Sequence, residues 1–508
     1  MYMEFAKQKT LLFILIFSFS GILFLILMYN LLIVKQSLVY ALEDDNITEI
    51  YKLLEYGNEN LFVLNNLQKA IVYFDKVLEI DGNDTLALNN KGLTLYRLGQ
   101  YENAIKYYDK VLSIDGNDTL ALNSKGLALY NLGQYENAIK YYDKVLLIDG
   151  NDTLALNSKG LTLSNLGQYE EAIHYYDKAL TINMNDTVSL NSKGLTLYRL
   201  GQYENAIKYY DKVLTINENN TKVLDNKGLA LYKLGQYENA SKYFDKVLAI
   251  DGNDTLALIN KGLVLTDQDR REEANEYYNK VLSISRNDTL ALNNKGLALY
   301  KLGQYENASK YFDKVLAINP NDNVALINKG AIFYHLDQYE NASKYFDKVL
   351  AINVIYPLAL NNKGLALSNL NQNEEAIKYY DKALTIDENN TKVLNNKGLA
   401  LYDLGDYEEA NKYYDKALDA DPHNLPIISN KGLTLVEIGE YSQAIDLSEP
   451  YLDENPNNKG LLCVLKNAYE KANNLSIAEY YKEILLEIDS SYKCQLIQLL
   501  SIEEEAFI

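Results

Sequence analysis

A repeat of 34 residues constrains what this chain can fold into more than any other feature. Each copy carries a Lys-Gly pair, and the spacing between successive pairs never changes. Because the spacing is constant, each copy packs on the next in the same way, which predicts a solenoid and not several globular domains. The glycines of these pairs are Gly92, Gly126, Gly160, Gly194, Gly228, Gly262, Gly296, Gly330, Gly364, Gly398 and Gly432.

The copy at residues 85–118 is typical of two helices joined by a short turn. Asn83, Asp84 and Thr85 are each suited to cap the first helix, and Gly99 suits the left-handed conformation of a turn. Gly92 on the first helix and Ala104 on the second are small, so we expect the two helices to touch there. Neither helix can bury its apolar face alone, and each pair therefore depends on its neighbours for stability.

These residues resemble the tetratricopeptide repeat (TPR) family. With Thr85 counted as position 1, Gly92, Ala104 and Tyr108 fall at positions 8, 20 and 24 of that repeat. The tryptophan that the family has at position 4 is Leu88 here. The resemblance covers residues 51–492, and it implies an all-α, right-handed α-solenoid of about 13 TPR helix pairs.

The two ends of the array depart from the repeat. The strongest repeats run over 85–458, and the first copy has Asn58 where the others have the packing glycine. Terminal repeats are commonly atypical because one of their faces has no neighbour. We expect residues 493–508 to form a capping helix that faces solvent.

The segment before the repeats predicts a membrane anchor. Residues 1–10 form a short N-terminus with two lysines, 11–34 contain no charge, and 35–50 form an acidic linker. As a transmembrane helix, the uncharged run would be roughly 36 Å long, enough to cross a hydrocarbon core of about 30 Å. A cleaved signal peptide ending near Ala41 is the alternative. The lysines favour a cytoplasmic N-terminus, and so a single-pass protein of the cell membrane with its solenoid outside the cytoplasm.

Composition argues against several classes of function. A net charge of −20 leaves no basic stripe for nucleic acid. No metal-binding motif, nucleophile elbow or phosphate-binding loop is present, so we expect no metal, no cofactor and no enzyme activity. Cys463 and Cys494 are expected to be free core thiols, with a bridge between them as the less favoured alternative. The lysines beside the packing glycines, such as Lys159, are expected to form solvated ion pairs with aspartates such as Asp143.

A row of asparagines at position 6 is the main candidate for a binding site. An asparagine amide offers a donor and an acceptor, which matches a peptide unit. The row is similar to the asparagine ladder in the TPR region of O-linked N-acetylglucosamine transferase, which implies that the amides face a concave groove and grip an extended peptide. Serines interrupt the row in earlier repeats, so we expect the C-terminal half to bind. The candidate residues are Asn226, Asn260, Asn294, Asn328, Asn362, Asn396 and Asn430.

Two further sets of residues repeat with the same period. Tyrosines at position 12 can add stacking or apolar contact to a bound peptide or glycan, although a packing role is an equal alternative. They include Tyr232, Tyr300, Tyr334 and Tyr402. Asn-x-Ser/Thr sequences are candidate N-glycosylation sites, although Asn-Asp-Thr is also the helix cap copied with each repeat. They include Asn46, Asn117, Asn151 and Asn253.

The sequence therefore predicts a membrane-anchored TPR scaffold that binds a protein or peptide partner and no nucleic acid. Two alternatives stay open. One is a cell-surface structural or glycan-contacting protein. The other is a non-catalytic subunit of a membrane-bound transferase or export complex.

Overall fold

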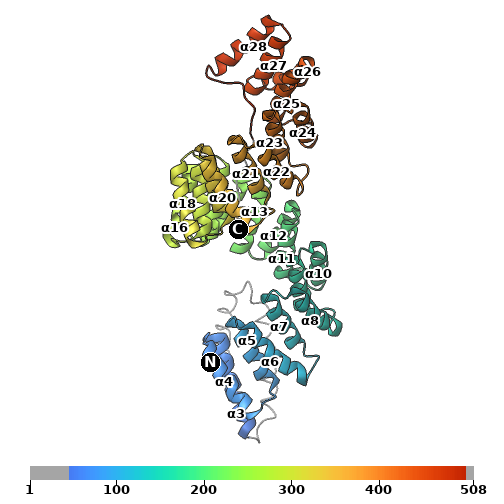
Figure 1. Cartoon of the computed structure of the whole chain (residues 1–508). Coiled ribbons are helices and arrows are strands. Elements are labelled where there is room, and N and C mark those ends of the chain that lie inside the picture. Colours follow the sequence, from blue (N-terminus) through green and yellow to red (C-terminus); the bar gives the residue numbers. More distant parts are fainter. Residues whose placement is uncertain (1–44, 499–508) are drawn as a thin grey trace. The chain divides into compact units, whose positions relative to one another are not determined.

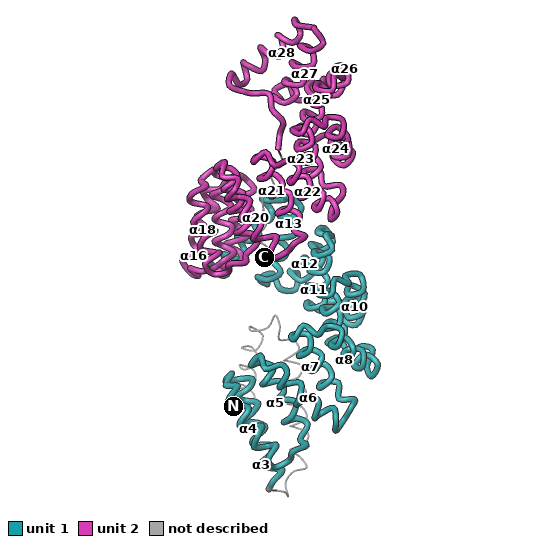
Figure 2. The backbone as a smooth tube through the Cα atoms, viewed as in Figure 1, with its two compact units in different colours: residues 1–252 teal, residues 253–508 magenta. Residues whose placement is uncertain are grey.

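The computed structural model describes residues 45–498, which form helices and contain no strand (Figure 1). These residues divide into two compact units between Gly252 and Asn253 (Figure 2). Together the units hold thirteen helix pairs within the described range, which confirms the predicted number of repeats. The predicted membrane helix at 11–34 lies outside that range. Within residues 45–498, no helix is long and apolar enough to span a bilayer.

The first unit contains six helix pairs, and each pair packs against the next one along the chain. A short π-helix, η2 (Glu59–Val63), follows the first helix. The pairs are α3 (Asp45–Asn58) with α4 (Leu67–Ile80), α5 (Thr85–Arg97) with α6 (Tyr101–Ile114), α7 (Thr119–Asn131) with α8 (Tyr135–Ile148), α9 (Thr153–Asn165) with α10 (Tyr169–Ile182), α11 (Thr187–Arg199) with α12 (Tyr203–Ile216), and α13 (Thr221–Lys233) with α14 (Tyr237–Ile250).

The second unit contains seven helix pairs that are built in the same way. They are α15 (Thr255–Asp267) with α16 (Arg271–Ile284), α17 (Thr289–Lys301) with α18 (Tyr305–Ile318), α19 (Asn323–His335) with α20 (Tyr339–Ile352), α21 (Pro357–Asn369) with α22 (Asn373–Leu384), α23 (Thr391–Asp403) with α24 (Tyr407–Ala420), α25 (Leu425–Ile438) with α26 (Tyr441–Glu454), and α27 (Lys459–Lys471) with α28 (Leu475–Ile488).

The ends of the helices follow from local sequence. Asp84 caps α5, and its Oδ1 accepts a hydrogen bond from the Ala87 N–H at 2.7 Å. Gly99 takes a φ of 73° in the turn to α6, a conformation that costs glycine nothing. Where the turn glycine is absent, Asp269 and Asn371 adopt φ values of 64° and 58°. Aspartate and asparagine are the residues that tolerate this conformation best after glycine, so the turn persists without it.

The packing glycines set the distance between the two helices of each pair. A Cβ atom added to Gly92 would lie 2.6 Å from Cε1 of Tyr108, which is buried in the second helix. The same contact with a tyrosine or phenylalanine recurs down to Gly398 and Tyr414. Leu88 packs with Val111 and with Ala121 of the following repeat, so each core is shared between neighbours.

The first repeat corrects the predicted alignment. Asn58 does not occupy the place of the packing glycine, because Gly57 does: a Cβ there would lie 2.5 Å from Cε1 of Phe74. The glycine therefore stands one residue further from its aromatic partner than in the other repeats. The wider turn of η2 follows directly after α3 and accommodates that extra residue.

The C-terminal end corrects two predictions. Residues 493–498 are not helical, so the expected capping helix is absent from the described part of its range. Cys463 and Cys494 are not free thiols either, because they form a disulfide with a Cα–Cα distance of 5.6 Å. Cys463 lies in the core on α27, and the bridge fastens the chain that follows α28 to that helix.

Candidate peptide-binding site

The position-6 asparagines are not the open row of amides that we expected. Asn226 is half-buried, and the other six are buried. Each lies on the first helix of its pair, and some of them bond to the preceding repeat. Asn396 Nδ2 donates to Asn361 Oδ1 at 2.9 Å, and Asn226 Nδ2 donates to Asn191 Oδ1 at 3.2 Å. These partners are asparagines at position 5, which also recur with the period of the repeat and which the sequence analysis missed.

In the second unit, five asparagines join into one chain of hydrogen bonds, which we call the amide chain. Asn430 Nδ2 donates to Asn395 Oδ1 at 2.8 Å, and Asn395 Nδ2 donates to Asn396 Oδ1 at 3.3 Å. From Asn396 the chain continues to Asn361, whose Nδ2 donates to Asn362 Oδ1 at 3.3 Å. All five side chains are buried, and a buried polar network of this kind is stabilising only when its members are paired.

The residues that follow α28 contact the amide chain through Ile497. The Ile497 N–H donates to Asn430 Oδ1 at 2.8 Å, and its carbonyl accepts from Asn430 Nδ2 at 2.9 Å. Asn395 Nδ2 donates to the same carbonyl at 3.0 Å. Both main-chain groups of one residue are therefore held by asparagine amides. We call residues 492–498 the C-terminal segment, and Figure 1 shows it running without helix from α28 back past α25 toward α23.

The residues beside Ile497 extend this contact in both directions. Gln498 Oε1 accepts from Asn369 Nδ2 on α21 at 2.9 Å and from the hydroxyl of Tyr334 on α19. Leu496 packs against the apolar cluster that contains Val464 on α27. The C-terminal segment thus contacts the first helices of five successive repeats, in the order opposite to that of the sequence.

One other position of the ladder, Asn294, is not paired in this way. Asn294 is buried, and neither its Nδ2 nor its Oδ1 has a hydrogen-bond partner. Its counterpart at position 5 of the preceding repeat is Ile259, which cannot accept a hydrogen bond. In the repeat of the first unit that has Ser158 at position 6, Asn157 Nδ2 instead donates to the cap residue Asp186 of the next repeat at 3.0 Å.

The position-12 tyrosines pack against tyrosines of their own repeats. The ring centroids of Tyr402 and Tyr407 lie 5.0 Å apart, and those of Tyr232 and Tyr237 lie 5.7 Å apart. Tyr300 is buried, whereas Tyr232, Tyr334 and Tyr402 are half-buried. Burial raises the pKa of Tyr334 to about 12. These rings therefore pack within their own repeats, and Tyr334 also contacts the C-terminal segment through its hydroxyl.

The lysine row corrects the prediction of solvated ion pairs. Lys159 is buried, and its Nζ contacts Asp143 at 2.5 Å and the hydroxyl of Tyr175 at 2.7 Å. Its partner Asp143 is about half exposed, with 47% of its side chain accessible. Burial lowers the pKa of Lys159, but hydrogen bonds to Asp143 and Tyr175 outweigh it and raise that pKa above its ordinary value. The row therefore belongs to the packing between helices.

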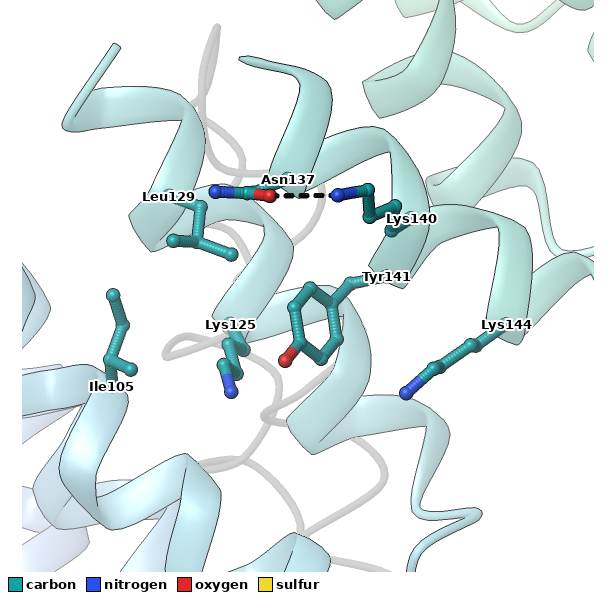
Figure 3. Close-up of a pocket in the computed structure, with 7 residues that line it drawn as sticks. All are labelled: Ile105, Lys125, Leu129, Asn137, Lys140, Tyr141 and Lys144. Carbon is teal, nitrogen blue, oxygen red and sulfur yellow. Dashed lines mark hydrogen bonds between the residues drawn. The ribbon is translucent and has the colours of Figure 1, made fainter. Parts of the chain in front are cut away.

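A pocket of 430 Å³ lies in the first unit between α6, α7 and α8 (Figure 3). Each of its three lysines has a partner. Lys125 pairs with Asp109, Lys140 donates to Asn137 Oδ1 at 3.1 Å, and Lys144 lies 5.1 Å from the ring centre of Tyr141. The residues that line the pocket are Ile105, Lys125, Leu129, Asn137, Lys140, Tyr141 and Lys144.

The remaining candidates lie on the surface. The sequon asparagines Asn46, Asn117, Asn151 and Asn253 are exposed, and the last three lie in turns before first helices. Across residues 45–498, no group of histidine, cysteine and acidic side chains is placed to hold a metal ion.

Sequence comparison matches two families. The tetratricopeptide repeat family matches residues 85–118, 289–322, 324–353, 357–390 and 391–424. The family described as anaphase-promoting complex, cyclosome, subunit 3 matches residues 131–213, 165–247 and 199–281. A comparison with curated proteins finds no matching sequence.

Structure comparison finds similar solved structures at low sequence identity. The APC/C hetero-tetramer Cut9–Hcn1 is 15% identical with a TM-score of 0.50, covering 90% of this chain and 96% of that one. Yeast Tom70 is 18% identical with a TM-score of 0.43, covering 86% and 96%. A tetratricopeptide repeat protein from Parabacteroides merdae ATCC 43184 is 18% identical with a TM-score of 0.42, covering 50% and 99%. At such identity, the first of these likenesses supports the fold alone.

The paired helices, the glycine–aromatic contacts and the shared cores define a helical-repeat scaffold. The chain is a tetratricopeptide repeat protein, as the repeated family matches show. This fold is suited to protein–protein interaction and is typically non-catalytic.

Proposed function

We propose that this chain is a membrane-anchored TPR scaffold that binds another protein by gripping an extended segment of it along the first helices. The observation that carries the proposal is the double contact of Ile497, whose N–H and carbonyl both bind the amide of Asn430. It supports the proposal because these bonds involve only main-chain atoms of the segment. An extended segment of another protein offers the same groups, whatever its side chains.

The predicted ladder is proposed as the surface that makes these contacts. One ladder asparagine stands in each repeat, and successive first helices would lie about 10 Å apart. An extended peptide rises about 3.3 Å per residue, so successive asparagines would meet roughly every third residue of the peptide. The half-buried tyrosines would add apolar contact at the rim. The proposed residues remain Asn226, Asn260, Asn294, Asn328, Asn362, Asn396 and Asn430 with Tyr232, Tyr300, Tyr334 and Tyr402.

The proposed location is the outer side of the cell membrane, with residues 11–34 as the anchor. The Cys463–Cys494 disulfide supports this side, because structural disulfides persist in oxidising compartments and are rare in the cytosol. Asn46, Asn117, Asn151 and Asn253 would then be available as glycosylation sites. Protease added to intact cells should trim the solenoid, and full protection until lysis would contradict this orientation.

Site-specific photo-crosslinking in cells tests the binding surface. A photoreactive residue is placed at Tyr232, on a first helix, and at the exposed Lys242, on the second helix of the same repeat, as the matched control. Mass spectrometry of the adducts should show a peptide of one partner protein joined to position 232 and not to position 242. Sugar polymer at position 232 would favour the glycan-contacting alternative. Equal labelling of both positions would contradict the proposal.

A further inference from the structure

We infer that the C-terminal segment is an internal ligand of the ladder, and that a partner peptide reaches the ladder between α19 and α25 only after this segment has left. The inference rests on the proposed peptide binding and adds its regulation. The C-terminal segment contacts Asn430 and Asn395, which are the same residues that the main chain of a partner peptide would need.

The contact has the form of ligand binding more than of core packing. Ile497 is bound through its N–H and its carbonyl, and Gln498 through the end of its side chain. The segment has no helix or turn of its own, and its residues from Lys493 to Gln495 are exposed. A few hydrogen bonds and one partly buried leucine therefore hold residues 496–498 at the ladder, and another extended chain could replace each of these contacts.

The disulfide keeps this internal ligand close to its site. Cys494 is bridged to Cys463 on α27 and stands three residues before Ile497, so the segment begins at a fixed point beside the last first helix. A short tether of this kind gives a high effective concentration, which lets a weak contact exclude a free competitor. The bridge thereby favours the occupied state without any additional bond at the ladder.

A binding titration on the full chain in detergent tests the inference. The probe is a fluorescent peptide with the sequence of residues 490–498, carrying serine in place of Cys494. The open form is the double variant Cys494→Ser, Ile497→Pro, in which the bridge and the Ile497 N–H are both removed. The matched control is Cys494→Ser, Ile497→Ala, which keeps that N–H. Cys463 remains a buried thiol in both variants.

The open form should bind the probe about tenfold or more tightly than the wild-type chain, with the alanine control in between. Adding Asn430→Ala to the open form should abolish that gain. Equal affinity of the wild-type chain and the open form would overturn the inference.

A second measurement starts from the wild-type chain. In the wild-type chain, the Ile497 amide should be protected from hydrogen exchange, and Asn430→Ala should remove the protection. Exchange of the wild-type Ile497 amide at the rate of an unstructured peptide would also refute the inference.

The two experiments separate the inference from the proposed function. If no form binds the probe while position 232 still crosslinks to a partner peptide, the segment is a structural cap and the proposed function stands. If the open form binds the probe while position 232 crosslinks to nothing, the segment is a ligand of the ladder and the proposed function is contradicted.

Discussion

Replacing Gly92 by leucine tests whether the glycine–aromatic contact sets the packing of a repeat. A Cβ there would lie 2.6 Å from Cε1 of Tyr108 and 3.0 Å from Cδ1 and Cζ. Tyr108 is 1% exposed, so its ring cannot move out toward solvent. Overpacking of this kind costs about 1–3 kcal/mol, and we expect the upper end because three more carbons follow the Cβ. Leucine forms helix better than glycine by about 0.8 kcal/mol, so the net loss of stability is about 2 kcal/mol.

The assay is hydrogen exchange followed by mass spectrometry. Because each repeat contacts only its neighbours, exchange should rise in residues 51–152 and stay unchanged in the second unit. The control is Gly116→Ala in the same repeat, where a Cβ would lie 3.7 Å from the nearest atom, the carbonyl oxygen of Leu112.

Adding Tyr108→Leu to the variant should recover part of the lost protection, since it removes the ring that the new side chain meets. The reasoning would be refuted if Gly92→Leu and Gly116→Ala exchanged alike, or if Tyr108→Leu gave no recovery. A rise in exchange spread evenly over both units would refute the repeat-by-repeat account of stability.

Other contacts in the structure give three more predictions. Asn396→Ala removes a paired member of the amide chain and should lower the free energy of unfolding in urea by about 1–3 kcal/mol. Asn294→Ala removes an amide without partners and should lower it by less. Equal losses would contradict the assigned pairing. Asp84→Ala should lower the free energy of unfolding by about 1 kcal/mol, because α5 loses its cap. Asn83→Ala is the control, since it leaves the cap intact, and thermal unfolding of the two variants measures the difference. Burial raises the pKa of Tyr108 above its ordinary value of 10.0, so the contribution of this tyrosine to stability is complete below pH 10 and is lost as the pH rises further. The variant Tyr108→Phe, which copies Phe244 at the equivalent position of another repeat, should therefore lose less stability between pH 9 and 11 than the wild-type chain. Equal losses in the two chains would contradict this.

Local and nearest-neighbour features of the fold were predictable from the sequence. The helix pairs, the cap at Asp84, the turn at Gly99 and the contact of Gly92 all depend on residues within one 34-residue copy. Repetition made the spacing visible many times over. The first repeat was misaligned because a π-helix, which has no marked sequence signal, moved the packing role from Asn58 to Gly57.

The candidate site was less predictable, because it depends on contacts between distant residues. Periodicity indicated which face the asparagines share, but not that Asn396 would pair with Asn361 of the preceding repeat. The row of asparagines at position 6 does not by itself reveal the second row, at position 5, with which it forms hydrogen bonds. The two rows have to be considered together. Nor does the short sequence around Ile497 show where it lies, since Asn430 is separated from it by 67 residues of chain.

The contacts of the C-terminal segment also require a fixed number of repeats between the points that it touches. Cys463 on α27 holds one point of the segment and Asn369 on α21 holds another. A tandem gene changes length by whole copies through unequal recombination. One copy gained or lost between α21 and α27 would put another repeat's residue in the place of Asn369, and the copies on either side hold His335 and Asp403 at that position. Copies added before α19 would disturb none of these contacts, so the array can lengthen on the N-terminal side of that helix without affecting them.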